Sequence, residues 1–218
     1  MRLSPARQHR LRMQAQLAAR EEGSGRHASG YELMLLQLSA DRRQLKGLQS
    51  TQRKAELKRE LLPKYTDWID GVLAADAARQ DDVLLFLMVW RIDAGDYAGG
   101  LQIAAHALRH GWVMPQTLGR RNVQTVVVEE LADQAEAALR RQATFPAEIL
   151  QDALTLTDGF DMPDQSLARL HKAIGAVLSA DQPEVALHHL TLALQLDPHC
   201  GVKKEKQQLE RRLRNANG

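Results

Sequence analysis

The chain has 218 residues, of which 44% are hydrophobic and only 4% are aromatic. That length and apolar content exclude a wholly disordered chain and fit one large or two small domains, while the scarcity of aromatic side chains argues against a base-stacking surface. The formal net charge is only +2, but the charge is unevenly divided along the chain.

Two basic ends flank an acidic middle. Residues 1–64 carry 14 Lys and Arg against 6 Asp and Glu, residues 65–200 carry 9 against 19, and residues 201–218 carry 6 against 2. The three net charges are therefore +8, −10 and +4. Neutralising phosphates requires positive charge at one surface, whatever the sum over the molecule. We expect the ends to be where nucleic acid is bound, and the middle to stay away from it.

Composition also predicts the fold class. Ala, Leu and Gln are abundant and β-branched runs are few, which favours an all-α protein. Cys200 is the only cysteine, so neither an intrachain disulfide nor a zinc site built on cysteines can form. The N-terminus lacks the apolar segment of a secretory signal, and the longest apolar run, residues 83–90, is too short to span a bilayer. We expect a soluble intracellular protein with no membrane partner.

Residues 1–30 are predicted to form a basic DNA-binding arm and joint. Ser4 and Pro5 read as the start of a helix that runs to about residue 22, and the glycines and serines of residues 23–30 indicate a flexible joint. Arginine suits phosphates and guanine edges, although a merely solvated helix face remains an alternative. The candidate DNA-binding residues, which continue onto the next helix, are Arg7, Arg10, Arg12, Arg20, Arg26, His27, Arg42, Arg43 and Lys46.

Residues 31–63 are predicted to form one long amphipathic helix, from about residue 31 to residue 61, which Pro63 ends. Apolar residues recur at spacings of three and four, as on a helix face that packs against a partner, although Arg42 and Gln52 interrupt the heptad. We expect this face to mediate self-association. Its residues are Tyr31, Met34, Leu35, Leu38, Leu45 and Leu48.

Residues 64–200 are predicted to form an acidic body of antiparallel helical hairpins. Two segments, 86 residues apart, carry small residues at the spacing of the second helix of a tetratricopeptide repeat, which predicts tetratricopeptide-like packing without a tandem array. The marking residues are Gly100, Ala104 and Ala107 in one segment, and Gly175, Ala186, Leu190 and Ala193 in the other. Residues 201–218 form a basic tail that looks marginally helical and to which no role is assigned.

Carboxylates that could bind a catalytic metal are densest at Asp81, Asp82, Asp93 and Asp96. The first two open one predicted helix and the last two close it, so we expect helix caps and turns and not a convergent site. Pro163-Asp164 could start a nuclease motif, but no strand is predicted to carry the rest of it.

Histidines and nucleotide motifs give no stronger signal. His106 and His110 are spaced i, i+4 and could face one metal, but no third ligand lies near them in sequence, so two surface histidines are expected. His188 and His189 point to different faces, Cys200 has no triad context, and no Walker-type loop is present. We therefore predict no catalytic residue, metal or cofactor.

Several short islands of sequence, taken in order, carry a family resemblance. They are SPARQH at 4–9, RHA at 26–28, YELML at 31–35, DRRQLK at 41–46, KRELLP at 58–63, QDD at 80–82, WRIDAGD at 90–96, GWVMP at 111–115, DMPD at 161–164, LHKAIG at 170–175 and GVKKE at 201–205. Together they resemble the small terminase subunit of cohesive-end temperate tailed phages, a family also labelled "terminase, endonuclease subunit".

The resemblance implies a viral DNA packaging protein of the host cytoplasm. Small terminase subunits bind the packaging (cos) site on double-stranded viral DNA as ring-shaped homo-oligomers and recruit the large terminase subunit, which cuts and translocates DNA. The label assigns an endonuclease role to relatives, whereas the residues of this chain show no nuclease or ATPase motif. Two alternatives stay open: a helical-repeat docking scaffold that does not bind DNA, and a metal-dependent endonuclease.

Overall fold

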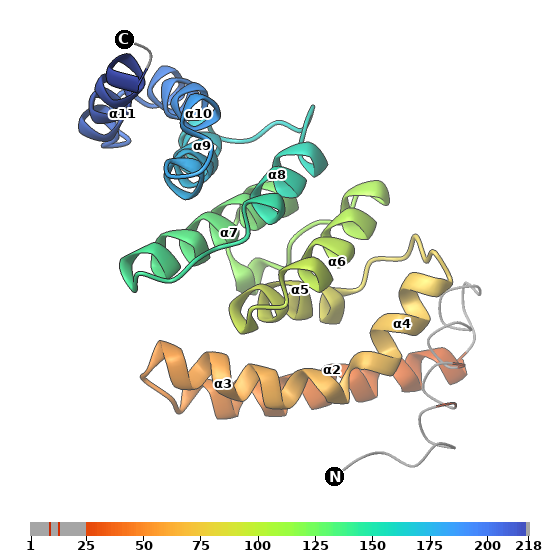
Figure 1. Ribbon diagram of the computed structural model, residues 1–218. Helices are drawn as coiled ribbons and strands as arrows, with labels where there is room; N and C mark the ends of the chain where they lie inside the picture. The colour runs from red at the N-terminus through yellow and green to blue at the C-terminus, as the bar shows by residue number, and fades with distance from the viewer. Residues whose placement is uncertain (1–8, 10–12, 14–24, 217–218) are drawn as a thin grey trace. The chain divides into compact units, whose positions relative to one another are not determined.

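The computed structural model describes His9, Met13 and residues 25–216, of which residues 25–29 are described by their backbone alone. Within these residues the chain is all-α, with ten α-helices, two short 3-10 turns and no strand (Figure 1). The predicted fold class is confirmed at this level. The chain divides after Arg120 into two compact units, so the boundary falls inside residues 64–200, which are predicted to form one body. None of the described helices is long and apolar enough to cross a membrane.

The first unit is built around one helix that is buried on nearly all sides. Its elements are α2 (Gly25–Lys46), α3 (Thr51–Leu61), η1 (Leu62–Lys64), α4 (Thr66–Ala74), α5 (Asp82–Ala94), α6 (Tyr97–Arg109) and η2 (Gln116–Leu118). Helix α5 packs against α2, α3, η1 and α6, which explains why its sequence is apolar without a periodic polar face. At Gly100 of α6 a Cβ would lie 2.7 Å from Ile92 Cγ1 of α5, so glycine permits the close approach of these two helices.

The prediction of one long helix over residues 31–61 is wrong. Helix α2 begins earlier, at Gly25, and ends at Lys46, and α3 then runs back beside it (Figure 1). Gly47 has low helix propensity, and Ser50 caps α3 by accepting a hydrogen bond from Arg53 N at 3.3 Å. The same amphipathic pattern therefore folds into a hairpin. Residues 25–30, expected as a joint, have helical backbone in α2.

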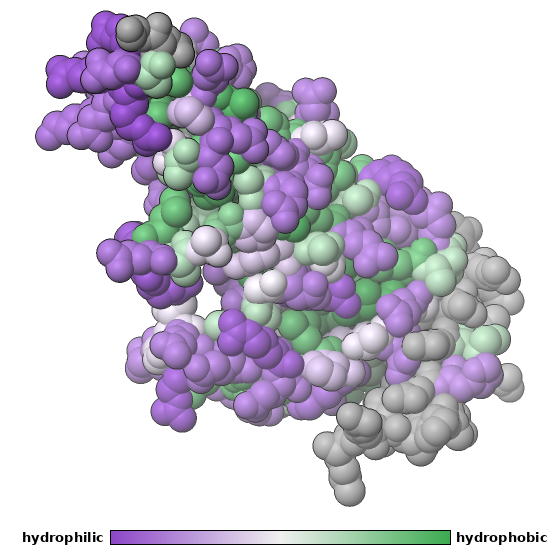
Figure 2. Space-filling model, viewed as in Figure 1, coloured by the Kyte–Doolittle hydropathy of each residue, from purple (hydrophilic) through white to green (hydrophobic). Residues whose placement is uncertain are grey.

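The second unit comprises α7 (Val123–Arg140), α8 (Ala147–Leu156), α9 (Asp164–Leu178), α10 (Pro183–Leu196) and α11 (Lys203–Ala216). Helices α9 and α10 approach closely at Gly175, where a Cβ would lie 2.7 Å from Leu190 Cδ2 and 3.2 Å from Ala186 O. The basic tail forms a full helix, α11, which packs on α10 and buries Val202 and Leu209. On the face seen in Figure 2, hydrophilic side chains predominate over α11.

Candidate functional site

The candidate DNA-binding residues fall into three groups. Arg7, Arg10, Arg12 and Arg20 lie outside the described residues, and Arg26 and His27 lie in the first turns of α2, where only the backbone is described. Arg42, Arg43 and Lys46 lie at the other end of α2. The guanidinium carbon of Arg42 lies 4.1 Å from the Phe86 ring centroid, so this half-buried side chain packs on α5, whereas Arg43 and Lys46 are exposed.

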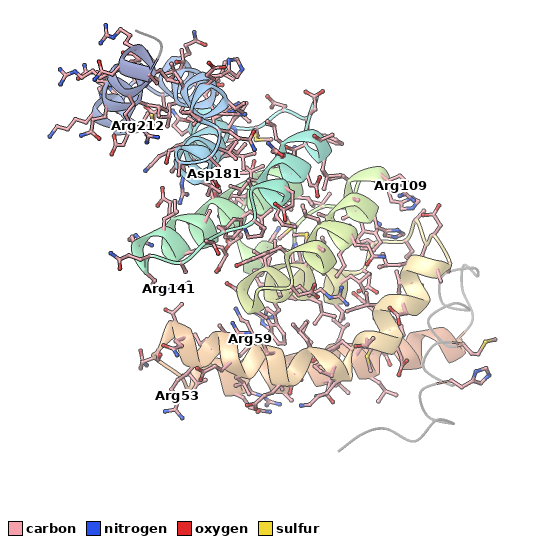
Figure 3. The ribbon with its side chains drawn as sticks, viewed as in Figure 1. Arg53, Arg59, Arg109, Arg141, Asp181 and Arg212 are labelled. Carbon is pink, nitrogen blue, oxygen red and sulfur yellow. The ribbon has the colours of Figure 1, made fainter. Side chains whose placement is uncertain are left out.

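The turn from α2 to α3 gathers positive charge. Residues 42–55 contain five Lys and Arg and no acidic residue. Because the hairpin reverses the chain, the first turn of α3 brings Arg53 and Lys54 to the end of α2 that carries Arg43 and Lys46; Figure 3 shows Arg53 at this end. We call these four residues the basic turn. Within the described part of the chain, none of them forms an ion pair.

Sequence reasoning missed Arg53 and Lys54 because it extended one straight helix through them. Along such a helix Arg53 would lie about 15 Å beyond Arg43 at 1.5 Å per residue. The sequence feature that predicts the turn is Gly47 followed by Ser50, a helix-ending residue and then a residue that caps the next helix.

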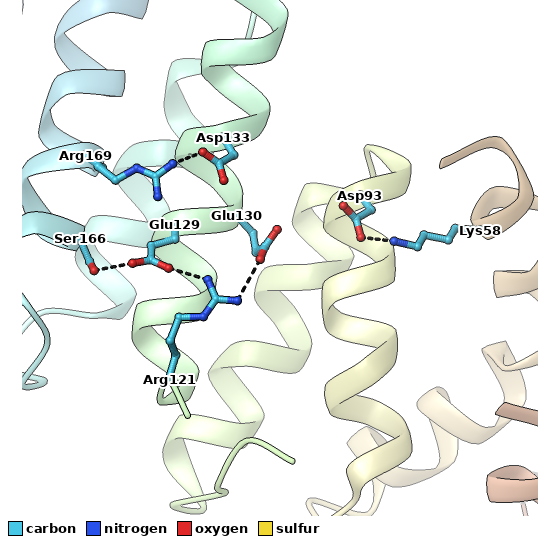
Figure 4. A network of polar contacts seen from close by, with 8 residues as sticks. All are labelled: Lys58, Asp93, Arg121, Glu129, Glu130, Asp133, Ser166 and Arg169. Atoms are coloured by element: carbon cyan, nitrogen blue, oxygen red, sulfur yellow. Dashed lines mark hydrogen bonds and ion pairs between the residues drawn. The ribbon is translucent and has the colours of Figure 1, made fainter. Parts of the chain in front are cut away.

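The later basic residues of α3 are engaged inside the unit. Lys58 forms an ion pair with Asp93 of α5 (Figure 4), and Arg59 Nε donates a hydrogen bond to Ala94 O at 2.7 Å. These interactions hold α3 on the end of α5. The basic residues of α3 thus have two roles: Lys58 and Arg59 bind to α5, and Arg53 and Lys54 belong to the basic turn.

A buried carboxylate fixes α2 in place. Asp41 is only 1% exposed and accepts hydrogen bonds from the Tyr65 hydroxyl at 2.8 Å and Gln37 Nε2 at 2.9 Å. Lys64 Nζ lies 3.3 Å from its other oxygen, so the buried charge is paired. Burial, together with the hydrogen bond to Asp41, raises the pKa of Tyr65 well above its usual range. This network ties α2 to η1.

The candidate self-association residues lie mostly inside the chain. Met34, Leu38 and Leu45 are buried in the first unit, and Leu48 is half-buried. Tyr31 stacks on Trp68 with ring centroids 6.3 Å apart. The amphipathic face therefore packs against this chain's own helices.

A different apolar side of α2 remains exposed. Leu33 is 56% exposed and Leu36, about one turn further on, is 66% exposed. The predicted Leu35, at 37%, lies on another side of the helix. We call Leu33 and Leu36 the leucine ridge. The predicted stripe is the side that the chain buries, but α2 carries apolar residues on more than one side, so it is less amphipathic than predicted.

The acidic group does not converge. Asp81 caps α5 by accepting a hydrogen bond from Leu84 N at 3.0 Å, and it also accepts one from Trp68 Nε1 at 2.9 Å. Burial raises the pKa of Asp81 to about 6. Asp96 caps α6 through Gly99 N at 3.1 Å. The expectation of caps is confirmed for these two carboxylates.

Asp82 and Asp93 have separate roles. Gln80 Nε2 donates a hydrogen bond to Asp82 at 2.8 Å, and Asp93 pairs with Lys58. Asp82 and Asp93 thus have partners other than those of Asp81 and Asp96. Among the described residues these four carboxylates form no metal site. A different group of potential metal ligands does come together there: Asp76, His106 and His110.

The cluster of Asp76, His106 and His110 joins the segment between α4 and α5 to the end of α6. Asp76 Oδ1 lies 3.0 Å from His110 Nε2, 3.6 Å from His106 Nδ1 and 2.9 Å from the Arg109 guanidinium. His106 is 3% exposed, so the expectation of two surface histidines is wrong for this residue. Its ring packs edge-on against Trp112 with centroids 5.0 Å apart.

The electrostatics of the cluster follow from burial and pairing. Burial lowers the pKa of His106, while the hydrogen bond from His110, helped by Arg109, lowers the pKa of Asp76. Asp76 was missed because it lies far upstream of the histidines. Its left-handed backbone, with φ of 48°, is the local feature that turns it toward them.

Two further histidines meet in the second unit. His171 Nδ1 and His189 Nδ1 lie 2.8 Å apart across α9 and α10, and burial lowers the pKa of His171 to about 4. His188 is exposed, which agrees with the expectation that it and His189 face different sides.

Much of the acidic charge of α7 is paired within the second unit. Arg121 bridges Glu129 at 2.5 Å and Glu130 at 3.5 Å, and Arg169 of α9 pairs with Asp133 (Figure 4). Lys172 continues this row to Glu136 at 2.9 Å. The pairs made by Arg169 and Lys172 hold α7 against α9, and Arg121 ties the segment before α7 to that helix. The acids of α8 and α10 remain as the less compensated charge.

Comparison with known proteins shows the family to which the chain belongs. The family model of the phage small terminase subunit matches residues 35–165. The chain is 43% identical over 213 residues, 97% of its length, to the "Terminase, endonuclease subunit" of Escherichia phage P2, and the match spans 86% of that protein. It is 27% identical over 109 residues to the "Probable terminase, endonuclease subunit" of Haemophilus phage HP1, which covers 50% of this chain and 37% of that protein.

The chain therefore belongs to the phage small terminase subunit family, as the sequence islands predict. Members of this family take part in packaging phage DNA. No solved structure matches the chain.

Proposed function

We propose that this protein binds the packaging (cos) site of double-stranded phage DNA as a ring-shaped homo-oligomer in the host cytoplasm and recruits the large terminase subunit. The basic turn is the observation that carries the DNA-binding part. Four exposed or half-exposed cations stand together, and no acidic residue lies between them in sequence, which is the local charge that phosphate contacts need.

Helix α2 links the basic turn to the arm. It has 22 residues and is about 33 Å long, with Arg26 and His27 at its start and the basic turn at its end. That length is close to the roughly 34 Å of one turn of B-DNA. Phosphate contacts from the two ends of α2 would therefore fall on the same face of a duplex.

Self-association would multiply these contacts. The leucine ridge is an apolar surface on α2 that the chain itself leaves exposed, and apolar surface of this kind favours burial against a second copy. A ring would gather the arms and basic turns of several copies. Weak phosphate contacts then add through effective concentration, with a steep dependence on salt.

The large subunit would dock on the helical hairpins. Helices α5–α6 and α9–α10 are packed closely through Gly100 and Gly175, at the positions where the sequence resembles tetratricopeptide repeats. Rigid hairpins of this kind present a defined surface to a partner. The acids that remain outside the α7–α9 ion pairs favour a basic partner surface.

The DNA-binding test is a duplex titration at two salt concentrations. In one variant Arg43, Lys46, Arg53 and Lys54 are all changed to Gln. We expect the steepness of log K against log salt concentration to fall by about 3.6, roughly 0.9 for each of the four phosphates that are no longer neutralised, with binding weaker at low salt. The matched control changes Lys203, Lys204, Arg211 and Arg212 of α11 to Gln, which removes the same charge elsewhere. An equal weakening in both variants would contradict a site at the basic turn.

The two alternatives make different predictions. A docking scaffold without DNA binding predicts no salt-dependent affinity of the wild type for the duplex. A metal-dependent endonuclease, as the names of the relatives suggest, predicts cleavage of packaging-site DNA by this chain alone with Mg²⁺. Asp81, Asp82, Asp93 and Asp96 offer no convergent site for that chemistry, so we rank it below DNA recognition.

A further inference from the structure

Three side chains of the first unit converge outside the proposed DNA surface. Asp76 comes from the segment between α4 and α5, and His106 and His110 lie one helical turn apart at the end of α6. One ligand atom from each lies within 4.8 Å of the others. A zinc ion with bonds of about 2.0–2.1 Å at tetrahedral angles sets its ligand atoms roughly 3.3–3.4 Å apart, so small side-chain movements would complete the geometry.

The hydrogen bonds of His106 leave one nitrogen free for a cation. Its Nε2 lies 2.9 Å from Ala77 O, and a carbonyl only accepts, so Nε2 carries the ring proton. In the neutral ring Nδ1 then holds a lone pair that faces Asp76 Oδ1 at 3.6 Å, too far for a hydrogen bond. A buried imidazole that donates one N–H to a backbone carbonyl and directs the other nitrogen at a carboxylate has the arrangement of metal-binding histidines.

We propose that Asp76, His106 and His110 bind a divalent ion of the Zn²⁺ class through Oδ1, Nδ1 and Nε2. Two imidazole nitrogens and one carboxylate suit zinc and its neighbours in the first transition row, whereas Mg²⁺ and Ca²⁺ favour oxygen ligands. Three protein ligands leave a fourth position for water. The ion replaces the proton that His110 shares with Asp76 and clips the segment after α4 to the end of α6.

Arg109 distinguishes a metal site from an ordinary ion-pair cluster. Its guanidinium lies 2.9 Å from the same Asp76 oxygen and is 61% exposed at the end of α6 (Figure 3). A bound cation would repel it and compete for the carboxylate. If the cluster is a metal site, replacing Arg109 should leave the metal affinity unchanged or make it tighter. If the cluster is only structural, the replacement removes one ion pair and has no metal affinity to change.

The test uses the full chain, purified without a polyhistidine tag and stripped with a chelator. Calorimetric titration with Zn²⁺ should give one site per chain, and Co²⁺ should give the intense visible bands of four-coordinate cobalt. Asp76→Asn keeps the shape of the side chain and tolerates left-handed backbone, and His110→Ala removes a side chain at the edge of the core. Each should weaken Zn²⁺ binding by more than about 100-fold, the upper end of the effect of an outer hydrogen-bond partner.

The controls separate the site from other histidines. His188→Ala, an exposed histidine of the second unit, should bind Zn²⁺ like the wild type, and Arg109→Gln should bind equally or more tightly. Saturating Zn²⁺ should raise the Tm of the wild type but not of Asp76→Asn. Absence of a stoichiometric site, or equal affinity in wild type and Asp76→Asn, would overturn the proposal.

Discussion

Three of the buried polar residues of this protein are held by hydrogen bonds to residues far away in sequence, so the local sequence does not predict them. Asp41, Asp81 and His106 are each nearly inaccessible, and each is satisfied by a partner from another element. A buried polar group without a partner would cost several times the net gain of a hydrogen bond. The pairing therefore offsets the cost of burying these three polar side chains.

The His171–His189 pair predicts a pH dependence at this scale. Because the pKa of His171 is lowered to about 4 in the folded state, the unfolded chain takes up a proton first as the pH falls below 6.5. The free energy of unfolding should fall between pH 6.5 and 4, by an amount on the order of 3 kcal/mol, and then level off.

Urea unfolding of the wild type and His171→Gln across this range measures the effect. Asp81, whose raised pKa acts in the opposite direction as the pH changes from about 4 to 6, is common to both proteins and cancels in their difference. Parallel stability curves for the two proteins would contradict the prediction.

At the scale of elements, the decisive feature is how closely helices can approach. Gly100 and Gly175 lie where any side chain would meet a neighbouring helix, and both belong to segments that sequence spacing marks as hairpins. The close approach of α5 and α6, and of α9 and α10, follows from these positions. The break between α2 and α3 was not predicted, since its glycine and serine are weak signals inside a continuous amphipathic pattern.

Gly100→Ala tests the close approach. Its Cβ would lie 2.7 Å from Ile92 Cγ1 in a fully packed core, so we expect a destabilisation of about 1–3 kcal/mol despite alanine's higher helix propensity. The control is Gly47→Ala, whose Cβ would meet only Gln44 O, at an ordinary contact distance of 3.4 Å. Chemical unfolding of both variants should show the destabilisation for Gly100→Ala alone; a more stable Gly100→Ala would exclude tight packing there.

At the scale of the whole molecule, charge and apolar surface are divided among the parts. The basic turn and leucine ridge both lie on or beside α2 in the first unit, and α11 holds the second basic surface. In the second unit the acidic residues of α7 are paired by Arg121, Arg169 and Lys172. This division supports a first unit that binds DNA and further copies.

The leucine ridge predicts the oligomeric state. Changing Leu33 and Leu36 together to Glu places charge on the apolar surface, so native mass spectrometry should show the variant as a 24.4 kDa monomer and the wild type as a multiple of that mass. Val113→Glu, at a site 71% exposed in a loop, is the matched control and should assemble normally. An unchanged assembly in the ridge variant would place the interface elsewhere.

The sequence by itself determined the all-α class, the family, the charge division and the helix caps at Asp81 and Asp96. These follow from composition, residue order and spacing along one helix, which are local properties. The tertiary structure decided that α2 and α3 form a hairpin, that Met34, Leu38 and Leu45 are core, and that Asp76 meets His106 and His110. Those outcomes depend on which distant segments pack together, because a buried face looks the same in sequence whether its partner is the same chain or another.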